Sequence, residues 1–164
     1  MQKLLIIFFM FGVVMTSTAC SGDNPLSEEP DNTPGEEGYI DLSTIQFSIQ
    51  IGETVFYADP IDHATTKDFM SMLPLTLSMG DIRNREKLGY LSRNLSEGGT
   101  VQTTYEVGDM SYWPNGPGLA VFYNHDGREV ASGLVPLGKI ISGIENFNVT
   151  GSVEVTIDVV EKTN

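Results

Sequence analysis

Four basic side chains lie close together in a chain that is otherwise strongly acidic. Arg83, Arg85, Lys87 and Arg93 are four of its nine lysines and arginines. A guanidinium group binds a carboxylate or a phosphate through two parallel hydrogen bonds. This segment, which also contains Glu86, is therefore a candidate site for an anionic ligand or a peptide carboxylate. The alternative is a solvated loop whose cations pair with the protein's own carboxylates.

Four aromatic side chains flank the densest turn signal of the chain. Tyr112 and Trp113 precede the segment 114–118, which holds two prolines and two glycines, and Phe122 and Tyr123 follow it. Such a pattern predicts a β-hairpin, and its rings can stack on a flat ring, a sugar or a proline. Neighbouring side chains on a strand point to opposite faces, so some of these rings are expected to pack in the core or close the end of a barrel. The candidate ligand-binding residues are thus Arg83, Arg85, Glu86, Tyr112, Trp113 and Phe122, with Trp113 expected to face the ligand.

Other kinds of site are not indicated by the sequence. His63 and His125 are the only histidines, and neither has a cysteine or carboxylate at a metal-ligand spacing. The single cysteine, Cys20, belongs to the lipidation motif at the end of an export signal, and no nucleophile motif is present. We therefore predict no metal, no cofactor and no catalytic residue.

The charge balance limits the partners that the chain can have. Twenty-two acidic residues against nine basic ones give a net charge of −13, and residues 21–66 contain no lysine or arginine. Nucleic acids require a basic footprint, and anionic membrane surfaces attract basic segments. We expect neither nucleic-acid binding nor an electrostatic membrane contact.

The pattern of apolar residues predicts a mainly β domain. Strict alternation at 44–51 and 153–159 predicts two half-buried strands. Further strands are predicted at 54–58, 75–79, 101–106, 109–113 and 119–123, with an apolar segment at 130–141 and a hairpin turn at Asp126-Gly127. Asp62 is predicted to cap one short helix that runs to Met72 and ends before Pro74. Residues 81–94 are predicted to be a polar connection, and the whole is typical of a barrel or a sandwich.

An export signal is predicted for residues 1–19. Lys3 is followed by an apolar run at 4–15 and then by small residues up to Cys20. The run is shorter than the roughly 20 apolar residues of a membrane-spanning helix. Ser17-Thr18-Ala19-Cys20 resembles the lipobox of bacterial lipoproteins, in which the cysteine is lipidated and becomes the first residue. The alternative is an ordinary secretory signal with an incidental cysteine.

Residues 20–38 are predicted to be the lipidated cysteine and an acidic disordered linker. The segment is rich in Gly, Pro, Ser, Asp and Glu and contains one large apolar side chain, Leu26. It resembles the acidic signal that sends some Gram-negative lipoproteins to the cell surface, although a plain solvated spacer explains it as well. We expect an exported protein that a lipid holds in the cell envelope, at the outer membrane of a Gram-negative bacterium.

The order of motifs over residues 44–160 resembles the bacterial cyclophilin-like fold proteins. The resemblance rests on the stretches 69–77, Glu86-Lys87, 108–114, 119–123 and 135–139. It implies that residues 39–164 form a closed, flattened antiparallel β-barrel with one or two short helices. The prolyl-isomerase signature of Phe, His and Arg followed by Gln-Gly-Gly is missing, so the resemblance implies no settled activity.

Three functions remain open at this stage. The first is a membrane-anchored domain that binds a small molecule or an extended peptide in a cleft near the aromatic hairpin. The second is an exported peptidyl-prolyl isomerase, which needs an arginine aimed at the prolyl nitrogen. The third is a structural or adaptor lipoprotein that docks another envelope protein. The sequence predicts nothing about the oligomeric state.

Overall fold

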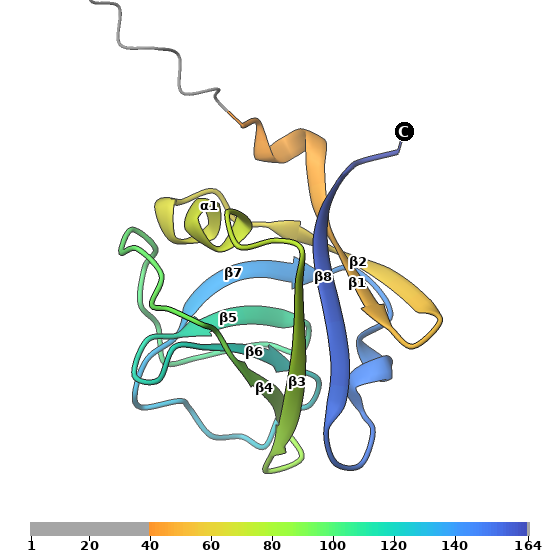
Figure 1. The fold of residues 1–164 in the computed structure, drawn as a ribbon. Coiled ribbons are helices and arrows are strands. Elements are labelled where there is room, and N and C mark those ends of the chain that lie inside the picture. The colour runs from red at the N-terminus through yellow and green to blue at the C-terminus, as the bar shows by residue number, and fades with distance from the viewer. Residues whose placement is uncertain (1–39, 164) are drawn as a thin grey trace, which may run out of the picture. The chain divides into compact units, whose positions relative to one another are not determined.

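A computed structural model describes residues 40–163. Within this part eight strands close into an antiparallel barrel in the order β1-β2-β7-β5-β6-β4-β3-β8 (Figure 1). The strands are β1 (Ile45–Ile51), β2 (Thr54–Pro60), β3 (Leu75–Ile82), β4 (Glu86–Tyr90), β5 (Asp109–Trp113), β6 (Gly118–Phe122), β7 (Val135–Ile140) and β8 (Val153–Glu161). The helical elements are α1 (Ala64–Met70) and the 3-10 turns η1 (Leu42–Thr44) and η2 (Ile144–Phe147). The predicted mainly β, closed antiparallel barrel is confirmed.

The barrel interior is filled by the side chains that point inward from alternate positions of each strand. Phe47 and Ile49 on β1 and Val155 and Ile157 on β8 are fully buried or nearly so. These are the positions that the alternating pattern places on one face. Phe69 of α1 packs edge-on against Phe47, with ring centroids 5.6 Å apart, so the helix covers one end of the barrel (Figure 1). No helix of the described residues is long and apolar enough to cross a membrane.

The N-cap of helix α1 lies one residue later than predicted. His63 is the N-cap, because its Nδ1 accepts a hydrogen bond from the backbone N–H of Thr66 at 3.2 Å. Asp62, the predicted cap, instead pairs with Lys67 at 2.8 Å. The helix ends at Met70, and the Leu73–Pro74 peptide bond that precedes β3 is cis.

Three predicted elements differ in the structure. Residues 81–94 contain strand β4, whose apolar pattern is hidden because Glu86 faces outward and Lys87 faces inward. Residues 101–106 form only one bridge, from Gln102 to Leu134, because they lie over the outer face of the barrel. Asp126-Gly127 is not a hairpin turn, since β6 pairs with β4 and β5 whereas β7 pairs with β2 and β5.

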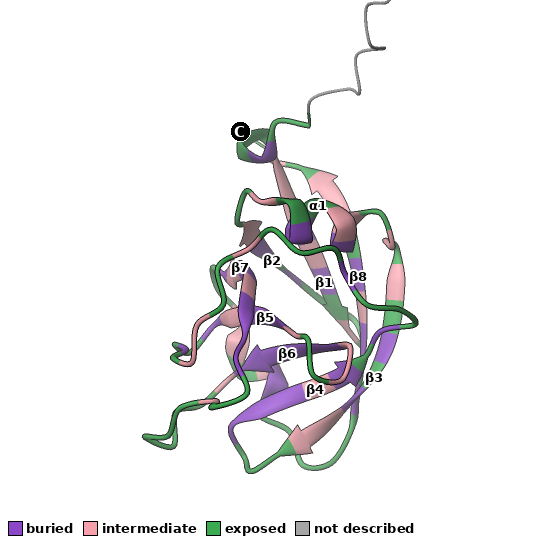
Figure 2. Cartoon of the chain, turned by 90° about the vertical axis from the view of Figure 1, so that its left-hand side faces the viewer, coloured by how far each residue is buried: buried purple, intermediate pink, exposed green. Residues whose placement is uncertain are grey.

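Strand β6 is buried on both of its faces. All five of its residues are buried, and Figure 2 shows the buried positions gathered on β5, β6 and β7. Leu119 and Val121 point into the barrel, whereas Ala120 and Phe122 belong to a second apolar cluster with Tyr105 and Leu134. This second cluster lies on the outside of the barrel. The segments that form it also make the walls of the candidate site.

Candidate ligand-binding site

A cavity of about 480 Å³ opens on the outer face of β4 and β6. Its floor contains Leu88, Ala120 and Phe122, and residues 129–132 form the wall opposite β4. The β3–β4 turn lies at one end and Trp113 at the other, because Glu86 pairs with Phe122 while Tyr90 and Trp113 both pair with Gly118. Most of the lining is apolar with a few polar groups, as is usual for small-ligand sites of this size. The lining residues are Ile82, Arg83, Arg85, Glu86, Leu88, Tyr90, Trp113, Ala120, Phe122, Glu129, Val130, Ala131, Ser132 and Leu134.

Trp113 is held in a fixed position at its end of the cavity. Its indole Nε1–H donates to Ser132 Oγ at 2.8 Å, and Asn115 Nδ2 donates to the backbone oxygen of Ser132 at 2.8 Å. A Cβ on Gly116 would come within 3.1 Å of the indole ring, so glycine lets the turn lie against the ring. The half-buried indole is therefore oriented before any ligand arrives.

The other end of the cavity contains a buried ion pair. Arg85 and Glu86 are 5% and 7% exposed, and both Nε and NH2 of Arg85 donate to the Glu86 carboxylate. The remaining nitrogen, NH1, lies 3.6 Å from Asp126. The hydrogen bonds from Arg85 to Glu86 raise the pKa of the guanidinium further above its usual value. The pair is thus a neutral unit, and Arg85 keeps little capacity to bind a ligand directly.

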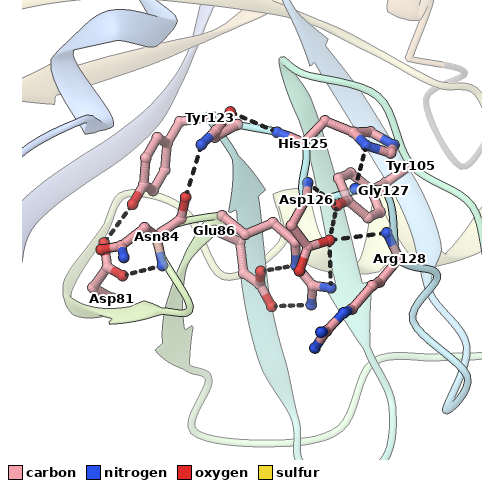
Figure 3. Close-up of polar contacts among 11 residues, drawn as sticks. Asp81, Asn84, Glu86, Tyr105, Tyr123, His125, Asp126, Gly127 and Arg128 are labelled. Atoms are coloured by element: carbon pink, nitrogen blue, oxygen red, sulfur yellow. Dashed lines mark hydrogen bonds and ion pairs between the residues drawn. The ribbon is translucent and has the colours of Figure 1, made fainter.

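A stack of three rings joins the loop after β6 to this ion pair. Tyr105 stacks on Phe122 with centroids 4.1 Å apart and on His125 with centroids 4.7 Å apart. Its hydroxyl donates to Asp126 Oδ1 at 3.1 Å, and the Arg85 guanidinium carbon lies 5.2 Å from the Tyr105 ring centroid (Figure 3). Burial raises the pKa of the Tyr105 hydroxyl. The loop is consequently fixed beside the cavity by stacking and hydrogen bonding together.

Five of the six candidate residues meet at this cavity. Arg83, Arg85, Glu86, Trp113 and Phe122 line it, although they come from the β3–β4 turn and from three strands, β4, β5 and β6. Tyr112 does not line it, because the alternation of β5 turns its ring into the barrel. There it is 4% exposed, and its hydroxyl accepts a hydrogen bond from the Leu95 N–H at 3.3 Å. That these five residues bind a ligand remains a prediction.

The basic cluster of the sequence is divided among three places. Lys87 points into one end of the barrel and pairs with Asp81 at 2.9 Å. Arg93 pairs with Asp68 of α1 at 2.6 Å. With Arg85 bound to Glu86, three of the four cations contact the protein's own carboxylates, which is the pairing that the alternative interpretation predicted. The solvated loop that it also predicted is wrong, because Arg85 and Lys87 are buried and Lys87 lies in strand β4. The four cations do not form one anion-binding surface.

Sequence reasoning missed Tyr105 and the wall formed by residues 129–132. Tyr105 had been assigned to a strand, and no motif marks Glu129, Val130, Ala131 or Ser132. Composition was the only available signal. Segments that contain an aromatic residue and apolar residues, as these do, are expected to bury those side chains against the rest of the domain. Among residues 40–163, no three His, Cys, Asp or Glu side chains are grouped so that they could hold a metal ion.

The closed eight-stranded antiparallel barrel places the domain among the small β-barrel folds. A model of the cyclophilin-like family matches residues 49–158, and the chain belongs to that family. The solution structure of the hypothetical protein AF2241 from Archaeoglobus fulgidus is similar, with a TM-score of 0.58. The two are 17% identical over 74% of this chain and 98% of that one, a likeness that concerns the fold alone. No curated protein matches the chain.

Proposed function

We propose that the described domain binds a small molecule or an extended peptide in the cavity beside Trp113. The observation that carries the proposal is the convergence of separate segments on one preformed hollow. The β3–β4 turn, strand β4, the β5–β6 hairpin and residues 129–132 all contribute to it. The oriented indole supplies a flat apolar face, and Arg83, Glu129 and Ser132 supply the few polar groups that such a site needs.

Trp113 is the only tryptophan of the chain, so its fluorescence reports on the cavity directly. Prolyl peptides, glycans and small carboxylates form the panel to be titrated. We expect at least one class to shift the Trp113 emission in a saturable way, because a ligand displaces water from the indole.

A variant that narrows the cavity mouth tests whether the signal comes from this site. Ala131 is exposed and lines the cavity, so Ala131→Phe should abolish the saturable signal without unfolding the domain. Thr54→Phe at the exposed start of β2, where Thr54 pairs with Ile51 of β1, is the matched control, because β1 and β6 lie on opposite sides of the barrel. Equal binding by the Ala131→Phe variant, or no shift with any member of the panel, would remove this proposal.

The second candidate is an exported peptidyl-prolyl isomerase, a function suggested by the cyclophilin-like family to which the chain belongs. The geometry gives it less support, because the guanidinium donors of Arg85 are engaged by Glu86 and Asp126. A protease-coupled assay with a proline peptide decides the question. Activity that disappears in Arg85→Ala but survives in Arg93→Ala would favour the isomerase.

Membrane attachment is part of the same proposal. Its support is the order of apolar run, small residues and Cys20 in the sequence, and all of these lie outside the described residues. Labelling of cells with palmitate tests it, since Cys20→Ala should abolish incorporation. The acidic segment that follows would then hold the domain away from the lipid surface.

A further inference from the structure

Two arginines stand apart from the other cations of the domain. Residues 40–163 contain eight lysines and arginines. Six of them lie within 4 Å of a carboxylate, whereas no ion pair of the described residues includes Arg83 or Arg128. In a protein with a net charge of −13, carboxylate partners are plentiful. Arg83 and Arg128 both belong to segments at one end of the cavity, and of the two only Arg83 lines it.

Arg83 lines the cavity from the β3–β4 turn. Arg128 directly precedes the wall residue Glu129, and its backbone N–H donates to Asp126 Oδ1 at 3.0 Å. The loop that carries Arg128 is attached to the turn, because Asn124 Nδ2 donates to the Asn84 oxygen at 3.1 Å (Figure 3). The two arginines thus come from segments that are joined to each other beside the buried Arg85–Glu86 pair.

The backbone at Arg83 is unfavourable for an arginine. Its φ is +60° and that of Asn84 is +52°, so both central residues of the β-turn 82–85 are left-handed, and the turn is closed by the hydrogen bond from Arg85 N–H to the Ile82 oxygen at 3.1 Å. Asparagine tolerates this conformation, whereas an arginine costs about 1 kcal/mol or more relative to glycine. Strained residues of this kind cluster at functional sites and ligand clamps.

The opposite end of the cavity is apolar. From Glu86 to Tyr90 the chain advances four residues along β4, or about 13 Å at roughly 3.3 Å per residue. Leu88 lies between them on the same face, and Trp113 lies at the Tyr90 end. The cavity therefore has a cationic end and an apolar aromatic end, separated by the length of a small amphipathic ligand.

We propose that the cavity takes an amphipathic carboxylate, either a small acid or the free carboxyl end of a peptide. The carboxylate would lie between Arg83 and Arg128, and the apolar body would extend over Leu88 toward Trp113. Of the acidic groups nearby, Glu86 is neutralised by Arg85. Asp126 and Glu129 keep their charges and accept hydrogen bonds from Tyr105 and Thr103, so the ligand carboxylate has to compete with them for the two arginines. This inference rests on the proposed ligand-binding function and specifies its ligand.

The test uses three compounds of one shape that differ in charge. The test uses the full protein, because Trp113 is the only tryptophan of the chain and its fluorescence reports binding at the cavity. We expect 4-phenylbutyrate to bind roughly tenfold more tightly than its amide, and 4-phenylbutylamine to bind no better than the amide. The preference for the acid should shrink when salt is raised to about 0.5 M. N-acetyl-Leu-Phe, as free acid and as C-terminal amide, distinguishes a peptide end from a free small acid.

Single charge removals locate the anion. Arg83→Gln and Arg128→Gln should each weaken binding of the acid several-fold and leave binding of the amide unchanged. Lys67→Gln, on α1 at the other end of the barrel, removes the same charge and is the matched control. Equal binding of the acid and the amide would overturn this inference while leaving the proposed function intact. An equal loss in Lys67→Gln, or tighter binding of the amine, would overturn it as well. If all of these compounds fail to bind, the inference is wrong and the wider panel alone decides the proposed function.

Discussion

At the scale of single residues, the Arg85–Glu86 pair dominates the energetics of the site. Their side chains are only 6% and 9% exposed, so each ion depends on the other for its solvation. A buried pair adds little net stability over an apolar pair of the same volume, but the loss of one member leaves a buried charge without a partner. The pair therefore constrains which substitutions are tolerated at its end of the cavity.

Glu86→Ala should lower the free energy of unfolding by about 3 kcal/mol, because the buried Arg85 guanidinium loses its carboxylate. Urea unfolding at neutral pH, followed by circular dichroism, measures the change. The double variant Arg85→Met/Glu86→Leu should recover most of the loss, since it removes both charges together. A single-variant loss below about 1 kcal/mol would show that water solvates the arginine.

At the scale of elements, the sequence predicted those strands that bury one face and expose the other. Strands β1 and β8 alternate cleanly, and the β5–β6 hairpin is marked by its turn. Strand β4 was not predicted, because a buried lysine, Lys87, occupies a position where an apolar residue is expected. The wall at residues 129–132 was not predicted, because an irregular segment has no periodic pattern of apolar residues. The site was thus predictable where a charged cluster or an aromatic hairpin marks its residues, as at Arg83, Arg85, Glu86 and Trp113, and not where a loop without such a signal covers it.

The ion pair between Asp68 of α1 and Arg93 in the loop after β4 makes a pH-dependent contribution to the stability of the fold. Arg93 donates two hydrogen bonds to the Asp68 carboxylate, and the Ser96 N–H donates a third at 2.5 Å. The hydrogen bond from Arg93 is the main cause that holds the pKa of Asp68 well below its usual value. A carboxylate with a depressed folded-state pKa stabilises the fold above its unfolded pKa of about 4. The stabilisation is lost as the pH falls through the folded-state pKa.

Asp68→Asn should therefore destabilise the domain at neutral pH and flatten its loss of stability below about pH 4. Urea midpoints measured from pH 7 down to about pH 3 provide the profile. Glu53→Gln on the exposed β1–β2 turn is the control and should leave both features unchanged. An Asp68→Asn profile that parallels the wild type would contradict this assignment of the acid transition.

At the scale of the whole molecule, Lys87 closes the end of the barrel opposite α1. Its ammonium group is fully buried and donates to Asp81 Oδ2 at 2.9 Å and to the backbone oxygens of Val149 and Gly151 at 2.5 and 2.6 Å. The Tyr123 hydroxyl donates to the same Asp81 oxygen at 2.6 Å. Burial, together with this carboxylate, raises the pKa of Tyr123 to about 12. One side chain thus ties β4 to the loop between η2 and β8.

Lys87→Met should cost about 3 kcal/mol of unfolding free energy, because Asp81 and two backbone carbonyls lose their common donor. Lys139→Met is the matched control. Lys139 also pairs with an aspartate, Asp109 at 2.7 Å, but it is 43% exposed, so its loss should cost less than about 1 kcal/mol. Thermal and urea unfolding of both variants give the comparison. Similar losses in the two proteins would mean that burial of Lys87 has little energetic weight.

The closure of the barrel also limits how a peptide can be recognised. Every strand of the described residues has a hydrogen-bonded neighbour on each side, although β2 with β7 and β3 with β4 pair over only three residues each. The sheet therefore has no edge strand that is free along its whole length. A peptide in the proposed cavity, which lies on a face of the sheet, would be held through its side chains and its charged end instead of through a continued ladder of main-chain bonds. Many copies of such a domain can also be crowded on one surface without joining edge to edge into larger sheets.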